Sequence, residues 1–180
     1  IDGKVINAEN KRNWQQTIGY VPQNIYLSDD TVSANIAFGV ENKNINHNSV
    51  VNAAKIANLH EFVTKELNNQ YETTIGERGV RLSGGQRQRI GIARALYHNP
   101  QVLILAEATS ALDNSTEKAV MDEVHNLSNE ITIILIAHRL STVEKCDKIF
   151  ILENGEVKNE GTFKELLKLD KKFQINANNQ

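Results

Sequence analysis

The sequence has little of several features that mark particular classes of protein. It contains one cysteine, Cys146, so it cannot form an internal disulfide, which fits a reducing compartment. Aromatic residues make up only 6% of the chain, so aliphatic residues must build the core. The formal net charge is -2 and the basic residues are scattered, which argues against a nucleic-acid partner. No apolar run approaches the roughly 20 residues that a membrane-spanning helix needs.

The 180 residues, 40% of them hydrophobic and 23% charged, are enough for one domain with its own core. The apolar runs at Val102 to Leu105 and Ile131 to Ala137 have the length of strands that are buried on both faces of a parallel sheet. Helical segments alternate with these strands. We therefore expect an α/β fold over residues 1–180, with a mostly parallel sheet flanked by helices and a small helical subdomain at about 29–86.

Hydrophobic spacing and capping residues predict the remaining elements. We expect the chain to fray after Asp170. Further strands are expected over Ile1 to Ile6, Thr17 to Val21, Lys148 to Leu152 and Glu156 to Asn159, and helices over Asp29 to Phe38, Val50 to Leu59, His60 to Leu67, Gln86 to Tyr97, Asn114 to Leu127 and onward from Thr162.

The segment Leu82-Ser83-Gly84-Gly85-Gln86 lies directly before a predicted helix. Its two glycines let backbone amides approach an anion, and the start of the helix adds partial positive charge. Ser83 adds a hydroxyl, so the segment can form a phosphate cradle without a lysine. A plain capping box between Ser83 and Gln86 explains the same residues equally well.

Three polar residues follow predicted strands, at the edge of the sheet where ligands bind in open α/β folds. Glu107 follows Val102 to Ala106, and its carboxylate can polarise a water molecule for attack on a phosphate. His138 follows the next buried strand, and Gln23 follows Pro22 at the end of an earlier one. Each alone is more often structural, but two such residues beside an anion cradle form a more specific pattern.

These motifs occur in the order found in ATP-binding cassette (ABC) proteins, and the chain resembles that family over nearly its whole length. Within the family it is most similar to exporters, including lipid flippases and drug or peptide exporters. The segments that carry the resemblance are Val21-Pro22-Gln23 for the Q-loop, Leu82 to Gln86 for the signature motif, Val102 to Glu107 for the Walker B strand, Ser110 to Asp113 for the D-loop, His138 for the switch histidine, and Thr74 to Gly79 with His138 to Thr142 for the exporter character.

The resemblance implies a P-loop NTPase-like core on the cytoplasmic face of a membrane. Its partners would be a transmembrane domain and a second nucleotide-binding domain, paired head to tail around two ATP molecules. The cofactors would be ATP and Mg²⁺. Ser83, Gly84 and Gly85, with Gln86 beside them, would bind the γ-phosphate of the partner's ATP. Glu107 would be the general base and His138 would contact the γ-phosphate. Gln23 would contact Mg²⁺, and Asp113 would cross the dimer interface.

The sequence departs from the family pattern in two places. The phosphate loop Gly-x-x-x-x-Gly-Lys-Ser/Thr does not occur in it, and the strand of that loop is central in the family's sheet. We therefore expect the N-terminal strands to be missing and a sheet edge to be open. The second departure is Ala106, where the family has an aspartate that holds Mg²⁺. Either an inactivating change or a degenerate site kept for binding explains this alanine, and we expect negligible ATP hydrolysis by this chain alone.

Two other functions remain open at this point. The chain can be a non-catalytic partner that contributes only its signature motif, which the missing loop and Ala106 favour. It can also be a soluble ABC ATPase of DNA repair or chromosome maintenance. Those proteins carry long coiled-coil insertions within the domain, and no such insertion is present here.

Overall fold

The computed structural model describes residues 1–77, 80–127, 130–137 and 139–178. The chain divides into two compact units, Ile1–Ile136 and Ala137–Gln180. Among the described residues, no helix combines the length and the apolar character needed to cross a membrane.

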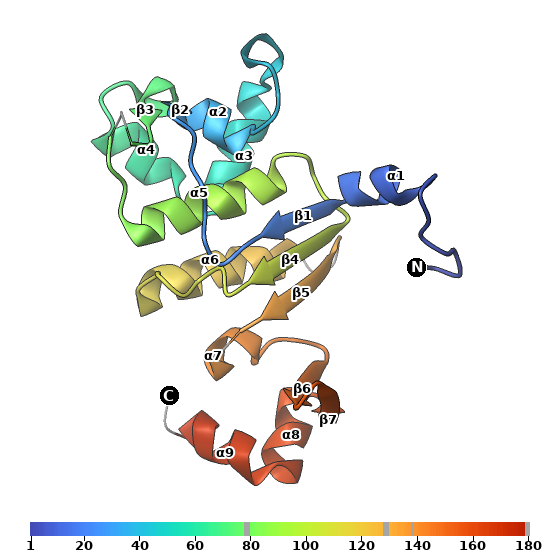
Figure 1. Cartoon of the computed structure of the whole chain (residues 1–180). Coiled ribbons are helices and arrows are strands. Elements are labelled where there is room, and N and C mark those ends of the chain that lie inside the picture. The colour runs from blue at the N-terminus through green and yellow to red at the C-terminus, as the bar shows by residue number, and fades with distance from the viewer. Residues whose placement is uncertain (78–79, 128–129, 138, 179–180) are drawn as a thin grey trace. The chain divides into compact units, whose positions relative to one another are not determined.

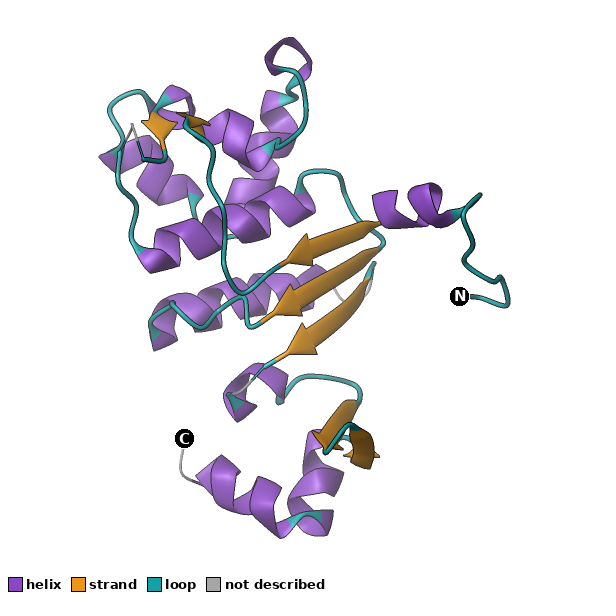
Figure 2. Ribbon diagram, in the orientation of Figure 1, coloured by secondary structure: helices purple, strands orange, loops and turns teal. Residues whose placement is uncertain are grey.

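The first unit contains a three-stranded parallel sheet with helices around it, as expected for an α/β fold (Figures 1 and 2). The sheet has the order β1-β4-β5, and a two-stranded antiparallel ladder joins β2 to β3. The elements are α1 Lys11–Gln16, β1 Ile18–Val21, β2 Asp30–Thr31, α2 Val32–Ile36, the 3-10 helix η1 Asn42–Asn44, α3 His47–Ile56, α4 His60–Glu66, the 3-10 helix η2 Gln70–Glu72, β3 Thr74–Ile75, α5 Gly84–Leu96, β4 Val102–Ala106, α6 Asn114–Asn126 and β5 Thr132–Ile136.

Side-chain caps start most of the longer helices near the predicted positions. Ser83 begins α5 with a complete capping box, and Thr31 and Asn46 accept hydrogen bonds from the first turns of α2 and α3. The residues Asn114 to Glu117 predict a capping box at the start of α6, but the N-cap lies one residue earlier. Asp113 is the N-cap, and Asn114 is already helical, because the Asp113 carboxylate reaches the amides of Ser115 and Thr116.

The two faces of the three-stranded sheet differ in burial. Leu103 and Leu105 of β4 join Val21 of β1 in one hydrophobic core with residues of α5 and α6. The opposite face is half-open, and the register places Tyr20, Ile104 and Ile134 side by side on it. The prediction that Ile131 to Ala137 is a buried strand was therefore wrong. β5 is an edge strand of this sheet, and its residues alternate between exposed and half-buried.

The second unit is smaller and consists of α7 Leu140–Val143, the antiparallel pair β6 Ile149–Glu153 and β7 Glu156–Gly161, α8 Phe163–Leu169 and α9 Lys171–Asn178. Asn154 and Gly155, which lie between the two predicted strands, form the turn that joins β6 to β7, both with positive φ. The predicted fraying after Asp170 was wrong. The Asp170 carboxylate accepts hydrogen bonds from the amides of Lys172 and Phe173, and α9 continues the chain.

The predicted N-terminal strand over Ile1 to Ile6 does not form. Asp2 and Gly3 make a turn with positive φ, and the segment beside it pairs with no strand of the described chain. The helical subdomain at about 29–86 stays a prediction. That range holds α2, α3 and α4, and its apolar side chains join the same core as the sheet.

Candidate functional site

Gln23 and Glu107 meet at the carboxyl edge of the parallel sheet. β1 and β4 are neighbours with Val21 paired to Leu105, so the residues that follow these strands emerge close together. The Gln23 amide Nε2 donates a hydrogen bond of 2.6 Å to Oε2 of Glu107. The sequence predicted both residues at this edge but not the bond between them. The contact orients the carboxylate and leaves the amide oxygen of Gln23 as a second oxygen donor beside it.

The backbone at Glu107 adopts a left-handed conformation with φ of 53°. A non-glycine residue in this region costs on the order of 1 kcal/mol, and such strain persists only where the surroundings impose it. Two backbone hydrogen bonds do so here. The Glu107 amide donates to the carbonyl of Ile136 at 2.9 Å, and its carbonyl accepts from the amide of Ser110 at 3.2 Å. Glu107 is therefore fixed at the end of β4 by both β5 and the turn that follows.

The oxygen donors at this edge suit a phosphate-bound metal poorly. Mg²⁺ requires near-octahedral oxygen coordination, usually with one or two carboxylates. Ala106 offers only a methyl group at the end of β4, next to Ile136 of β5. No group of three or more His, Cys, Asp or Glu side chains that could hold a metal occurs among the described residues. Gln23 and Glu107 can contribute oxygens, but the aspartate that the family pattern supplies is absent.

The first turn of α5 suits an anion well. Ser83 Oγ accepts from the Gln86 amide at 3.1 Å, and Gln86 Oε1 accepts from the Ser83 amide at 2.8 Å. This capping box uses two of the backbone amides and leaves those of Gly84 and Gly85 at the start of the helix, where no intrahelical acceptor exists. The phosphate cradle and the capping box, which the sequence presented as alternatives, are thus compatible in one turn.

Packing also leaves little room for a larger residue at either glycine. A Cβ atom on Gly84 would lie 3.2 Å from the Cβ of Ala111. A Cβ on Gly85 would lie 3.2 Å from the Ala111 carbonyl oxygen and 3.3 Å from Leu112 Cδ2. The start of α5 therefore lies directly against the turn that follows Glu107. The sequence suggested the approach of an anion but not this second reason for glycine.

Asp113 uses its carboxylate to begin α6. Oδ1 accepts from the amides of Ser115 and Thr116 at 3.1 and 3.0 Å and from the Ser115 hydroxyl at 2.5 Å. Hydrogen bonds from Ser115 and then Thr116 hold the pKa of Asp113 well below its usual range. The carboxylate is therefore ionised at neutral pH, and its expected role at an interface stays a prediction.

Two parts of the predicted site fall on residues outside the described ranges. His138 is one of them, so its position relative to Glu107 stays a prediction. The second part is Arg78 and Gly79, at the end of the exporter-like segment Thr74 to Gly79. Gly76 in that segment has φ of 111°, and a Cβ there would lie 2.5 Å from Oδ1 of Asp29, so only glycine fits.

Three polar side chains that link separate segments of the first unit were missed in the sequence. Gln88 bridges α5 to the turn after Glu107. Arg94 donates from Nε to the Asn35 carbonyl at 2.8 Å and from Nη1 to the Tyr26 carbonyl at 2.9 Å, and burial lowers its pKa. Asn35 in turn accepts from the Ser28 amide. The sequence feature that could have identified them is a polar residue on the apolar face of a predicted helix. A polar group buried there without a hydrogen-bond partner would destabilise the fold.

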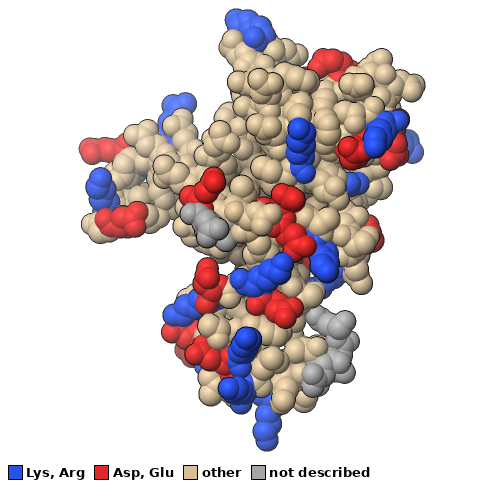
Figure 3. Space-filling model, turned by 180° about the vertical axis from the view of Figure 1, so that it is seen from behind, with Lys and Arg blue, Asp and Glu red and all other residues tan. Residues whose placement is uncertain are grey.

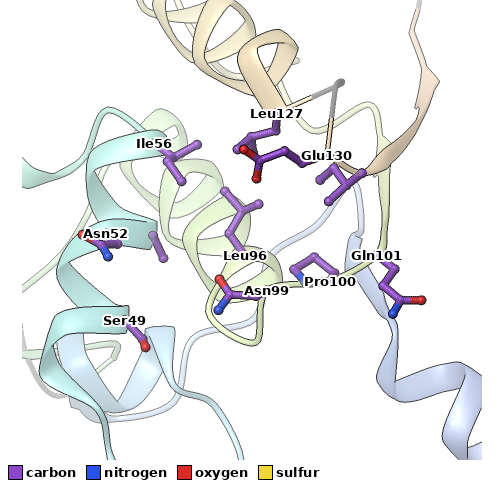
Figure 4. A pocket seen from close by; sticks show the side chains of 11 residues that line it. Ser49, Asn52, Ile56, Leu96, Asn99, Pro100, Gln101, Leu127 and Glu130 are labelled. Atoms are coloured by element: carbon purple, nitrogen blue, oxygen red, sulfur yellow. The ribbon is translucent and has the colours of Figure 1, made fainter.

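A cavity of about 350 Å³ lies at the opposite end of the strands (Figure 4). Ser49 and Asn52 of α3, Leu96 at the end of α5, and Pro100 before β4 line it, with Leu127 after α6. Pro100 precedes β4, whereas Gln23 and Glu107 follow β1 and β4, so the cavity is separate from the edge that carries Gln23 and Glu107. On the face shown in Figure 3, acidic and basic side chains are interspersed.

Comparison with known proteins identifies relatives for this arrangement. Residues 1–110 match the family described as ABC transporter. The chain is 47% identical over 93% of its length to ABC transporter B family member 18 of Arabidopsis thaliana, and 48% identical over 93% to the ATP-dependent lipid A-core flippase of Francisella novicida. It also superposes with a TM-score of 0.83 and 38% identity, over 92% of its length, on the structure of a bacterial Atm1-family ABC exporter with ATP bound. The chain spans 14%, 27% and 29% of these three proteins, respectively.

Proposed function

Because the chain belongs to the ABC transporter family, we propose that it is part of the nucleotide-binding domain of a membrane exporter. In this role it binds ATP, with Mg²⁺ held only weakly, at the cytoplasmic face of a membrane, in a head-to-tail dimer coupled to a transmembrane domain. The observation that carries the proposal is the Gln23–Glu107 contact of 2.6 Å at the carboxyl edge of the sheet. It places an oriented carboxylate where open α/β folds bind their ligands.

Each residue of the site has a distinct task in this proposal. The amides of Gly84 and Gly85 and the hydroxyl of Ser83 donate to the γ-phosphate of an ATP held mainly by the partner domain, and Gln86 keeps that turn in shape. Bound Mg²⁺ would neutralise charge on the phosphates.

On the chain's own ATP, Glu107 accepts a proton from the attacking water. Gln23 orients Glu107 and offers an oxygen toward the metal. His138 contacts the γ-phosphate, and Asp113 faces the partner domain.

Ala106 limits the reaction in this chain. A methyl group supplies no oxygen for Mg²⁺, so the metal would be held weakly even when ATP binds. We expect the purified chain to hydrolyse ATP negligibly. ATP turnover that copurifies with the chain and disappears in Glu107→Gln would contradict this expectation.

Restoring the missing oxygen tests the main proposal. In the full-length protein, Ala106→Asp should restore Mg²⁺-dependent ATP hydrolysis, and Glu107→Gln in that background should lower kcat by about 100-fold or more. The matched control is Ala106→Asn, which has nearly the same size but lacks the negative charge. Failure of Ala106→Asp to exceed Ala106→Asn would show that the site is degenerate for other reasons.

A non-catalytic role is the second candidate. Two features together favour it: the first turn of α5 is intact, and Ala106 stands where the family has a metal-binding aspartate. Here the chain contributes its signature motif to the ATP of a catalytic partner domain. ATP-dependent dimerisation with an intact partner domain, without turnover at the site of this chain, would support this role. The three relatives are a transporter, a flippase and an exporter, so nothing among them favours a function in DNA repair.

A further inference from the structure

Gln88 is buried within α5, with 4% of its surface exposed, although it carries a polar amide. Both ends of that amide are used. Nε2 donates to Ser110 Oγ at 3.0 Å, and Oε1 accepts from the Ala111 amide at 2.8 Å. One side chain of α5 therefore holds two successive residues of the turn that follows Glu107. A glutamine in this position has its hydrogen-bonding groups paired in a way that no apolar residue can reproduce.

The bridge joins two parts of the proposed site. Gln88 lies just over one helical turn after Ser83 and belongs to the helix whose first turn forms the phosphate cradle. Ser110 donates its backbone amide to the Glu107 carbonyl, so the bonded turn leads directly back to the proposed general base. The close approach of Gly84 and Gly85 to Ala111 and Leu112 brings the same two segments together a second time.

We propose that Gln88 is a positioning residue that couples the phosphate cradle at Ser83–Gln86 to the Glu107 turn. The proposal rests on the function proposed above. In a head-to-tail dimer the cradle serves the partner's ATP and Glu107 serves the chain's own, so Gln88 links the two nucleotide sites within one subunit. Its removal lets the cradle and the base move independently, which lowers the catalytic rate more than nucleotide affinity.

Hydrogen–deuterium exchange on the 180-residue chain tests the coupling without requiring activity. Gln88→Met keeps the length and volume of the side chain but cannot accept from the Ala111 amide. Exchange at Ala111 should become faster by roughly fivefold or more, the factor that corresponds to one lost hydrogen bond. The amides of Gln86 and Arg87 donate to Ser83 and so report on the shape of the cradle. Their exchange should also become faster, and this second effect is the sign of coupling.

Three further variants make the exchange result decisive. Gln16→Met replaces an exposed helical glutamine of α1 and should change neither segment. Gln88→Glu keeps an acceptor for Ala111 and should restore protection at both segments. Ser110→Ala removes the acceptor of the Gln88 Nε2 bond. Ser110 is exposed, so this change should leave the fold intact and gives the same test if Gln88→Met fails to fold. Faster exchange confined to Ala111, or no change in either segment, would overturn the coupling.

Kinetics of the full-length protein in the Ala106→Asp background complete the test. Gln88→Met should lower kcat by about 10-fold while the KM for ATP changes by less than about twofold, because the contacts of the chain's own ATP are untouched. Equal changes in both constants would indicate general loss of structure and would contradict a positioning role. If the Ala106→Asp parent is itself inactive, the proposed function fails, and the exchange result still decides whether Gln88 couples the two segments.

Discussion

The two faces of the three-stranded sheet have similar apolar sequences but opposite environments. On one face Leu103 of β4 is fully buried against the helices, whereas on the other Tyr20 is 57% exposed and Ile134 is 46% exposed. Strands of parallel sheets are normally covered on both faces. A continuous apolar run therefore predicts a strand whose two faces can both be buried. Which face is covered depends on the helices and strands that pack against it.

Among substitutions that leave the protein folded, truncation on the covered face should have the largest effect, and truncation on the open face a much smaller one. Leu103→Ala should lower the free energy of unfolding by about 2–5 kcal/mol, because it leaves a cavity among buried neighbours. Ile134→Ala should cost less than about 1 kcal/mol, because much of the side chain already contacts water. Urea unfolding followed by circular dichroism measures both. Equal losses would show that the second face is covered in solution.

Adding an atom to the covered face should have the next largest effect. A Cβ on Gly19 of β1 would lie 2.4 Å from the Ala95 carbonyl oxygen and 3.0 Å from Pro100 Cγ. Gly19→Ala should therefore cost about 1–3 kcal/mol, since α5 has to move away from the sheet. Tyr20→Leu on the open face of the same strand is the control and should change stability by about 0.5 kcal/mol or less. A Gly19→Ala protein as stable as the parent would mean that α5 adapts without cost.

Burial away from the sheet has an electrostatic consequence at alkaline pH. Desolvation raises the pKa of Tyr71 to about 12, and its hydroxyl lies 2.9 Å from Nδ1 of His60. Below pH 10 the tyrosine is neutral in both states, so its contribution is constant. Above pH 10 the unfolded chain releases the proton first, so stability should fall by about 1.4 kcal/mol per pH unit until about pH 12.

The measurement compares unfolding of the parent and Tyr71→Phe between pH 8 and 12. Other groups titrate in this range, but they titrate in both proteins, so the difference between the two curves isolates Tyr71. The difference should be flat up to pH 10 and should then change in favour of Tyr71→Phe. Parallel curves over the whole range would mean that the Tyr71 hydroxyl reaches water.

Much of this architecture could be predicted from local sequence signals. The parallel strands β1 and β4, the capping box of α5 and the turn at Asn154 and Gly155 follow from short patterns that act within a few residues. The motif order led to the family that the comparisons show. The placement of Glu107 at the end of β4 also followed, because a strand delivers the next residue to the edge of its sheet.

The missed features all depend on contacts between distant segments. The Gln23–Glu107 bond joins residues 84 positions apart, and the Gln88 bridge reaches Ser110, 22 residues later, only because α5 lies against that turn. The exposure of β5 depends on which strand lies beside it, which no property of the segment Thr132–Ile136 encodes. Period and propensity are local quantities, so they predict elements better than the pairings between them.

The smallest expected change in stability comes from placing a charge on the open face. Ile134→Lys should alter the free energy of unfolding by less than about 1 kcal/mol, because a lysine at an exposed edge position keeps its ammonium group in water. It should nevertheless reduce binding of an apolar dye and self-association measured by sedimentation, since exposed apolar patches drive both. Leu103→Lys is the matched change on the covered face and should prevent folding, because it buries an unpaired charge. If Ile134→Lys also prevents folding, this face is covered in the folded protein and the two faces are equivalent.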